Sequence, residues 1–469
     1  MTPTHATSSR TPMALLAVLC LVFGTMAAAQ QLATIDESLT QRRSLYPFRG
    51  SIPVIYAYGK PYERGVQIGR QIRALDPHIL SQVAQIRWTL MMKEIPGITR
   101  ENSTELRDEY IRRVSAELGA GIVTEYIDEM RGVGDGAGVS FDEMFMLNLG
   151  GHYRKFYIDE KKHPTPYYLE GDGCSSFSAW GKATTDGRMI ATHNCDWPRS
   201  PDRSMMVAVV LAPENGNRVV WADTIGLWGS HHIASDKVFV AGLALGTPKA
   251  KPRNLVPEGP NGMLQRWIVQ YANSAQHAHD MLMSKGGAGD RGVATPSGSL
   301  VYVDEKEAIY LQTAPDRIER IPNKDGWNAV TNHILVDAMK PHFTNPDRGV
   351  SGSANRLAAI TKLLQDSYGK IDIPTAVSIM STHYDPSTGR DNPFNPTPCS
   401  HGEFRGQASG TNLSTIVKLE EDTVWLALGN PCTGTYTKVR IGSREEIEAA
   451  AKKVLAGLPT STNSSAARH

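Results

Sequence analysis

Between residues 60 and 149, apolar side chains recur every three or four positions, which is the spacing of one face of an α-helix. The pattern runs through KPYERGVQIGRQIRALDPHILSQVAQIRWTLMM and continues through TELRDEYIRRVSAELGAGIVTEYIDEMRGVGDGAG. In SFDEMFMLNL, Ser140 stands three positions before Glu143, which is the capping-box spacing of a helix start. We therefore expect this part of the chain to be helical.

From Cys174 to about Leu245 the pattern changes to short β-rich runs, such as SMMVAVVLA, RVVWADT and KVFVAGLAL. The amphipathic stretches NGMLQRWIVQYA and SAQHAHDMLMSK then predict helices. The remainder repeats this order, with strands SLVYVDE, EAIYLQT and NAVTNH, helices SANRLAAITKLLQDS and PTAVSIMST, and strands STIVKLEE and DTVWLALG. Alternating strand and helix blocks favour an α+β fold of layered sheets covered by helices. We expect one large unit.

The segment GDGCSSFSAWGKATTDGRMIATHNCDWP, Gly171–Pro198, predicts a β-hairpin, because SFSAW and RMIATHN flank a polar turn containing Asp-Gly. Cys174 opens this hairpin directly after Gly173. Asn194 and Asp196 lie near the end of the second strand, on one face by the period of two. We therefore expect polar side chains at the mouth of the hairpin that holds Cys174.

The charge balance adds little to this pattern. Lys and Arg number 49 against 48 Asp and Glu, for a net charge of +1. This excludes a strong electrostatic attraction to nucleic acid or to an anionic membrane and favours a small, nearly neutral substrate.

The chain starts with the features of a secretory signal peptide. Arg10 precedes the apolar run ALLAVLCLVFG, which is too short to span a bilayer, and an A-x-A site ends at Ala29. A lipoprotein signal at Cys20 is the alternative, but Leu19 stands where a small residue is expected. We expect residues 1–29 to be removed and the protein to be secreted or periplasmic, or lumenal in a lysosome-type compartment of a eukaryote.

Removal of the signal leaves Cys174, Cys195, Cys399 and Cys432. Three pairings are open if all four are bridged. Cys399 and Cys432 flank the last strands, and we expect a disulfide between them, which keeps Cys174 free. The segment HYDPSTGRDNPFNPTPCSHGEFRGQASGTN is expected to be a long loop, and residues 459–469 a disordered tail.

Cys174 would be a self-sufficient catalyst if the Gly173–Cys174 bond were broken. Its thiol, with a pKa of about 8.5, and its α-amino group, with a pKa of about 7.7–8.0, would supply nucleophile and base from one residue. Gly173 would give the backbone the freedom that attack on the preceding carbonyl requires. The alternative is an ordinary buried strand cysteine.

Other polar residues add to the candidate site. Asn332 and His333 follow a later predicted strand. The Asn332 amide is suited to donate to an oxyanion, and the Asp196 carboxylate to orient an α-ammonium. Trp197 and Trp228 are candidate pocket walls. Taken singly, Asn and Asp at strand ends are more often turn residues than catalysts.

Five motifs in order along the chain resemble the isopenicillin N acyltransferase-like C45 peptidase family, which belongs to the N-terminal-nucleophile (Ntn) hydrolases. They are GKPYERGVQIG (Gly59–Gly69), YIDEMRGVGDGAGVSFDEMFMLNL (Tyr126–Leu149), DGCSSFSAW (Asp172–Trp180), THNCDWP (Thr192–Pro198) and VTNH (Val330–His333). The resemblance covers most of the chain after the predicted signal peptide. It implies a four-layer αββα sandwich with a helical N-terminal segment.

The resemblance also implies autoproteolysis at Gly173–Cys174, giving a helical chain of residues 30–173 and a catalytic chain of residues 174–458 that remain together as a heterodimer. Cys174 would be the nucleophile, Asp196 would position the new amino terminus, and Asn332 would donate to the oxyanion. Asn194 matches the family's asparagine, and His333 is a further substrate or oxyanion candidate. No cofactor and no metal are implied.

Two departures concern substrate contacts. Cys195 stands where the family often has tryptophan, and MLNLGGHY lacks the arginine that commonly follows LN. We therefore expect an enzyme that cleaves a linear amide of a small molecule through an acyl-enzyme on Cys174, with water as acceptor because acyl-CoA is a cytoplasmic donor. An acyltransferase that passes the acyl group to an amine, and a phospholipase B-like lipid acyl hydrolase, remain open alternatives.

Two further alternatives depart from this mechanism. A metal hydrolase would use SHHIASD (His231, His232 and Asp236), THNCD, and STHYD (His383 and Asp385), although no pair of histidines has H-x-x-x-H spacing. A secreted binding protein would use exposed aromatic residues, namely Trp180, Trp197, Trp221 and Trp228. An uncleaved chain would favour the binding protein.

Overall fold

The computed structural model describes residues 33–35, 52–94, 99–148, 173–198, 206–226, 232–249, 261–286, 298–347, 350–393, 396–404 and 407–458. The predicted signal peptide, the predicted tail and Trp228 lie outside these residues. In the described part of the chain, no helix combines the length and the apolar character needed to cross a bilayer.

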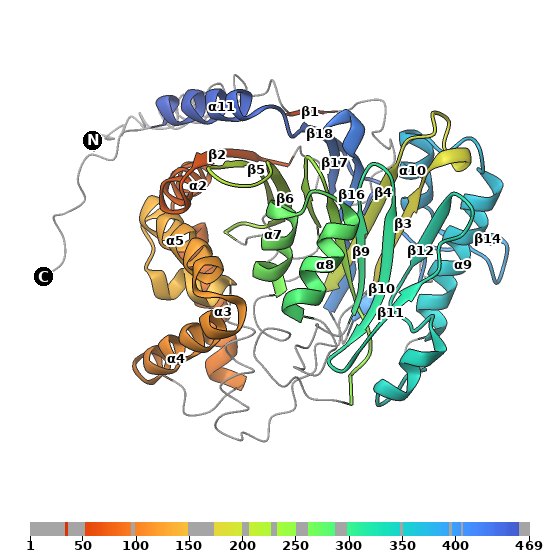
Figure 1. The fold of residues 1–469 in the computed structure, drawn as a ribbon, viewed down its shortest axis with the longest axis horizontal. Coiled ribbons are helices and arrows are strands. Elements are labelled where there is room, and N and C mark those ends of the chain that lie inside the picture. The colour runs from red at the N-terminus through yellow and green to blue at the C-terminus, as the bar shows by residue number, and fades with distance from the viewer. Residues whose placement is uncertain are drawn as a thin grey trace, which may run out of the picture.

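Two large sheets form the centre of the molecule (Figure 1). The first sheet has the order β1 (Ala33–Ile35), β18 (Tyr436–Arg440), β17 (Thr423–Leu428), β16 (Gln407–Lys418), β4 (Ile190–Pro198), β3 (Cys174–Ala179) and β12 (Trp327–Val330), with β15 (His401–Phe404) beside β16. The second has the order β11 (Arg317–Ile321), β10 (Ala308–Ala314), β9 (Gly298–Val303), β8 (Phe239–Ala244), β7 (His232–Ser235), β6 (Val219–Thr224), β5 (Met206–Pro213) and β2 (Val54–Gly59).

The two sheets pack face to face because their strands are apolar on both faces. In β5, Ala208 and Val210 enter the core between the sheets, whereas Val207 and Val209 enter the core beneath the helices. This alternation follows from the strand period of two. The core between the sheets also contains Cys174, so the predicted nucleophile belongs to the central packing layer.

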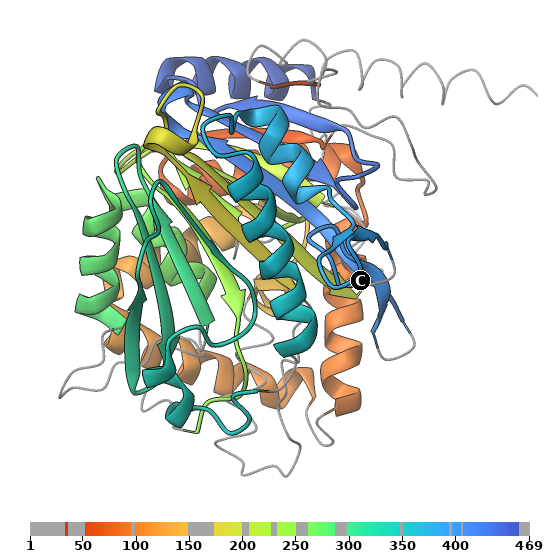
Figure 2. The same cartoon turned by 90° about the vertical axis from the view of Figure 1, so that its right-hand side faces the viewer.

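Helices cover both outer faces. On the second sheet the common core includes side chains from α2 (Pro61–Leu75), α3 (Ile79–Glu94), α4 (Arg100–Leu118), α5 (Ala120–Ala137), α7 (Asn261–Tyr271) and α8 (Ala275–Gly286). On the first sheet, α9 (Val350–Asp366) and α10 (Ile373–Met380) form the outer layer (Figure 2). The helix α11 (Arg444–Gly457) contacts β2 and β5 at the margin of the central core. The α+β class expected from the sequence is confirmed.

Glycines determine how α2 and α5 pack. Gly65 and Gly69 of α2 face Gly132 and Gly136 of α5, and a Cβ atom at any of the four would overlap backbone atoms of the opposite helix. The two helices therefore approach more closely than side chains with a Cβ would allow. This contact explains the glycines in two of the motifs that carry the family resemblance.

A buried ionic network joins the same helices to α7. Arg64 and Arg266 both contact Glu129, and all three side chains are at most 1 % exposed. Burial alone raises the pKa of Glu129, but the two guanidinium groups outweigh it and leave the pKa below its usual value. The segment before Cys174 is thus held to the segment after it by packing, by charge, and by the parallel pairing of β2 with β5.

Two local predictions have clear outcomes. The capping box is confirmed, since Glu143 N donates to Ser140 Oγ at 3.2 Å and Ser140 N donates to Glu143 Oε2 at 2.8 Å. The long loop is only partly correct. It contains the short pair β13 (Tyr384–Asp385) and β14 (Arg390–Asp391), and β15, which pairs with the start of β16.

The expected disulfide is wrong. Among the described residues no disulfide is formed, so Cys399 is not bonded to Cys432. The two cysteines do lie close together, but two histidines lie beside them. The four side chains form a group of potential metal ligands.

Candidate active site

The predicted hairpin is present. Strands β3 and β4 pair antiparallel with Cys174 opposite Cys195, and the turn between them contains the 3-10 segment η2 (Gly181–Ala183). In the first sheet β3 lies between β4 and β12; Cys174 pairs with β4, whereas the pairing with β12 reaches only to Ser176. Its side chain is 4 % exposed and faces the second sheet.

The peptide group between Gly173 and Cys174 is held on both sides. The N–H of Asp196 donates to the carbonyl oxygen of Gly173 at 2.7 Å. The N–H of Cys174 donates to Oδ1 of Asn332 at 2.6 Å. Two candidate residues from the sequence, Asp196 in β4 and Asn332 just after β12, therefore fix the carbonyl and the amide of the bond predicted to break.

Gly173 is required here for its small size. A Cβ atom at this position would lie 2.7 Å from Oδ2 of Asp196 and 2.8 Å from Cζ of Arg356. Both distances are too short for a carbon atom in nonbonded contact. From the sequence this glycine is expected to supply backbone freedom, and the structure adds that its missing side chain leaves room for a carboxylate and a guanidinium.

Arg356 is the main site residue that the sequence did not reveal. From α9, its Nη1 donates to the carbonyl oxygen of Cys174 and, at 3.0 Å, to Oγ of Ser175, while Nη2 donates to Oδ1 of Asn332 at 2.8 Å. The side chain is 5 % exposed. Burial lowers the pKa of Arg356, and the charges of Asp196 and Cys174 act in the opposite direction. A guanidinium stays charged in any protein site, so it brings a fixed positive charge to the start of β3.

A signal for Arg356 was present in the sequence. Ile360 and Leu364 follow it at intervals of four on the predicted helix, and both are fully buried. An arginine on the apolar face of a helix is buried with that face, and a buried arginine needs hydrogen-bond acceptors or a carboxylate beside it. The partners could not be identified, since they lie in distant segments.

Asp196 is oriented by β16. Oγ1 of Thr411 donates to Oδ1 of Asp196 at 2.7 Å, and the carboxylate is 2 % exposed. The pairing of β16 with β4 shifts register between Thr411 and Leu413. Irregularities of this kind bend a strand and redirect its side chains, and this one lies beside the candidate site.

Asn332 presents its oxygen to Cys174. Oδ1 accepts from two N–H donors, the Cys174 amide and Arg356, while Nδ2 donates to the carbonyl oxygen of Ala244 at 2.8 Å. These partners set the orientation of the amide. In the uncut chain Asn332 therefore acts as an acceptor for the Cys174 nitrogen, and its role as an oxyanion donor stays a prediction that depends on the second N–H of Nδ2.

His333 lies beside this group. Its Nδ1 is 2.8 Å from Oγ of Ser353 and 3.2 Å from Oγ1 of Thr331. Burial, and then the charge of Arg356, lower the pKa of His333 below its ordinary value. The imidazole is therefore neutral at pH 7.

Asn194 is not brought to Cys174. Its Nδ2 donates to the carbonyl oxygens of Met380 and Pro398, each at 2.8 Å, on the side of the first sheet that α10 covers. Trp197 packs at the margin of the central core, and its Nε1 lies 2.6 Å from Sγ of Cys195. Of the sequence candidates, Cys174, Asp196 and Asn332 converge, whereas Asn194 connects the sheet to a neighbouring loop.

The aromatic residues of the binding-protein alternative mostly serve as packing. Trp221 is 2 % exposed, and the guanidinium of Arg266 lies 4.1 Å from its ring centroid. Trp180 packs against the central core. Neither forms an exposed aromatic platform.

Of the residues proposed for a metal hydrolase, His231 lies outside the described residues, and the described ones do not assemble as that alternative requires. His232 stacks on His193 with ring centroids 4.3 Å apart, while Asp236 pairs with Arg218. Asp385 accepts from the N–H and Oγ of Ser387. Within the described ranges, His383 instead joins three ligand-type side chains from other segments, which are considered below.

Comparison with known proteins assigns no family. No protein-family profile matches the chain. An uncharacterized protein from Archaeoglobus fulgidus is 22 % identical over 407 residues, which covers 79 % of this chain and 64 % of the relative. The chain thus spans less than two thirds of the length of that relative.

Two solved structures of the conjugated bile acid hydrolase from Clostridium perfringens, both of single-residue mutants, are similar in part. One gives a TM-score of 0.36 at 12 % identity, and the other gives 0.34 at 11 % identity. Each alignment covers 54 % of this chain and 89 % of the other. These scores are too low to argue a shared fold, so the assignment of function depends on the geometry around Cys174.

Proposed function

We propose that this protein is a self-processing cysteine hydrolase of the Ntn type, similar to C45 peptidases, that cleaves linear amides of small molecules. One observation carries the proposal. The Gly173–Cys174 peptide is held by Asp196 at its carbonyl and by Asn332 at its amide, with Arg356 bonded to the next carbonyl. The helix, sheet, sheet, helix order of the layers supports the assignment to the αββα sandwich.

The first reaction would be cleavage of the chain. Sγ of Cys174 attacks the carbonyl carbon of Gly173 and forms an S–C bond. The thiol proton passes to the Cys174 nitrogen as the C–N bond breaks, which leaves a thioester and a free α-amino group. Water then hydrolyses the thioester, giving a carboxylate on Gly173 and a thiol on Cys174. The Asp196 N–H stabilises the charge that develops on the Gly173 oxygen.

The second reaction would be turnover of substrate by the exposed amino terminus. The α-amino group accepts the thiol proton while Sγ attacks the amide carbonyl, and the resulting ammonium protonates the leaving amine. Water releases the acyl group from Cys174. Asn332 Oδ1 and the Asp196 carboxylate hold the amino terminus, and Arg356 adds positive charge where the oxyanion forms.

The cleaved chains would stay associated. Strand β2 precedes the cleavage site and pairs with β5, which follows it, and both sides of the cut contribute to the core beneath the helices. Breaking one peptide bond removes none of these contacts. The predicted signal peptide supports export, and export favours water over an amine as the acyl acceptor.

The test is acyl-enzyme trapping on the purified protein. Incubation with a panel of N-acyl amides, followed by an acid quench and intact-mass measurement, should add one acyl group to the chain that begins at Cys174. Release of free acid would identify hydrolysis, and acyl transfer to an added amine would identify the acyltransferase alternative. An unprocessed, unlabelled protein with every substrate would refute the proposal.

A further inference from the structure

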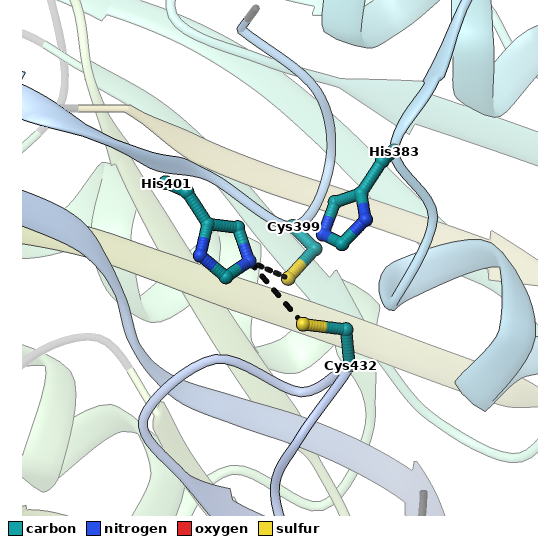
Figure 3. A group of neighbouring side chains, drawn as sticks. All are labelled: His383, Cys399, His401 and Cys432. Carbon is teal, nitrogen blue, oxygen red and sulfur yellow. Dashed lines mark hydrogen bonds between the residues drawn. The ribbon is translucent and has the colours of Figure 1, made fainter. Parts of the chain in front are cut away.

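Four ligand-type side chains converge on the side of the first sheet that faces α10. They are His383, Cys399, His401 and Cys432, called here the Cys2His2 cluster, and their ligand atoms all lie within 4.8 Å of one another. Figure 3 shows the four side chains pointing toward a common centre. His383 follows α10, Cys399 precedes β15, His401 begins β15, and Cys432 lies between β17 and β18.

The spacing of these atoms suits a single ion. Tetrahedral zinc binds sulfur at about 2.3 Å and imidazole nitrogen at about 2.0–2.1 Å, so neighbouring ligand atoms lie roughly 3.3–3.8 Å apart. Nε2 of His401 is 3.4 Å from Sγ of Cys399 and 3.2 Å from Sγ of Cys432. We propose that the Cys2His2 cluster binds one Zn²⁺ ion in a closed, structural site.

The donor set distinguishes zinc from other occupants. Two thiolates and two neutral imidazoles match the tetrahedral S2N2 preference of zinc, and the thiolates cancel the charge of the ion. A two-iron cluster would place the cysteines on one iron and the histidines on the other. Here His401 is next to both sulfurs, so the four groups surround one centre. Four protein ligands also leave no open position for catalysis.

The surroundings of the cluster fit a metal site. Nδ2 of Asn430, a residue only 3 % exposed, lies 3.9 Å from Sγ of Cys399 and donates to the carbonyl oxygen of Ser400. Amide donors of this kind orient and stabilise metal-bound thiolates. Nε2 of His383 is buried, and the His383 ring interacts with the Cys432 thiol. A shared metal ion would bind both groups.

The cluster is next to the candidate active site. Ser400, which follows Cys399, exchanges hydrogen bonds with Thr411 at 3.0 and 3.1 Å, and Thr411 Oγ1 donates to Asp196. Asn194 also binds the carbonyl of Met380, shortly before His383. A zinc ion would therefore join three loops and fix the segment that orients Asp196.

The experiment measures metal in the full chain. Wild type and Cys174→Ala are purified without chelators and analysed by inductively coupled plasma mass spectrometry. One zinc per protein molecule is expected in both. Because Cys174→Ala blocks the proposed processing, metal binding is read independently of the proposed function. The reduced, metal-stripped protein should also develop the visible bands of thiolate-bound tetrahedral Co²⁺, and added Zn²⁺ should abolish them.

Variants locate the metal. His401→Ala and Cys432→Ser should lose it, whereas the matched control Cys195→Ser should retain it because Cys195 lies outside the cluster. Asn430→Ala should weaken Zn²⁺ affinity by about 10- to 100-fold. Protein without metal that also forms no Co²⁺ bands would overturn the proposal, even if the variants fail to fold. Full retention of metal in both His401→Ala and Cys432→Ser would overturn it as well.

Discussion

The backbone N–H of Asp196 donates a 2.7 Å hydrogen bond to the carbonyl oxygen of Gly173. Oδ2 of the same residue lies 2.7 Å from the position that a Cβ atom on Gly173 would occupy. Asp196 therefore supplies both a hydrogen-bond donor to the Gly173 carbonyl and a carboxylate beside the amino terminus that cleavage would create. The two steps of the proposed mechanism depend on this single geometry.

Gly173→Ala should slow self-cleavage. The added methyl would overlap the Asp196 carboxylate and the Arg356 guanidinium, so the peptide group must shift. A displacement of about 1 Å can cost roughly 100-fold in rate. The half-time of cleavage, followed on denaturing gels after translation, measures the effect. Gly402→Ala is the control, because a Cβ there meets nothing within 4 Å, and an equal rate in both variants would contradict the steric argument.

Arg356→Met should reduce processing and turnover by about 100- to 1000-fold, the cost of losing one oxyanion-type donor. The rates of Arg356→Lys should lie between those of wild type and Arg356→Met. An ammonium keeps the positive charge but cannot donate to both Cys174 and Asn332 with the planar fork of a guanidinium. The control is Lys362→Met on the exposed side of the same helix, where Lys362 pairs with Asp366 one turn further on. Unchanged kcat in Arg356→Met would exclude a catalytic role.

Some residues of the candidate site can be predicted from the sequence and others cannot. The hairpin, and the positions of Cys174 and Asp196 in it, are predictable because strand periodicity and turn residues act within a few positions. Arg356 and Thr411 were missed because they meet their partners across 182 and 215 residues of sequence. Their placement depends on which strand adjoins which, and a single sequence does not encode strand order in a local pattern.

The same distinction applies to the fold. Helices α2 to α5 follow from apolar spacing, and so do most strands, since each pattern is local. The segment expected to be a long loop contains β15, because its pairing with β16 outweighs a composition rich in glycine, proline and asparagine. The Cys2His2 cluster has no short motif, since its ligands come from three segments.

Gly132→Ala should destabilise the protein. A Cβ at this position would overlap the carbonyl oxygen of Tyr62 and force α2 and α5 apart. Overpacking of this kind typically costs about 1–3 kcal/mol. Urea unfolding in the Cys174→Ala background measures the loss without the complication of two chains. Gly121→Ala in the same helix, where a Cβ meets nothing within 4 Å, should leave stability equal or higher. Equal midpoints for the two variants would argue against close packing.

His333 should make stability depend on pH. Its pKa is lowered in the folded protein by burial and by Arg356, so the unfolded chain takes up a proton first as the pH falls. The contribution of His333 to the free energy of unfolding is therefore fully present above the ordinary pKa of 6.5. It is lost as the pH falls from there through the lower pKa of the folded state. In the Cys174→Ala background, His333→Gln should show a smaller loss between pH 8 and pH 5. The same loss in both proteins would mean that other groups cause it.

The central claim is that the chain cuts itself before Cys174, and intact mass with N-terminal sequencing of the purified protein tests it most directly. Two chains, the larger starting CSSFSAW, are predicted for wild type, and one uncut chain for Cys174→Ala. A single wild-type chain that runs through Gly173 and Cys174 would contradict the account and leave Cys174 as a buried strand residue.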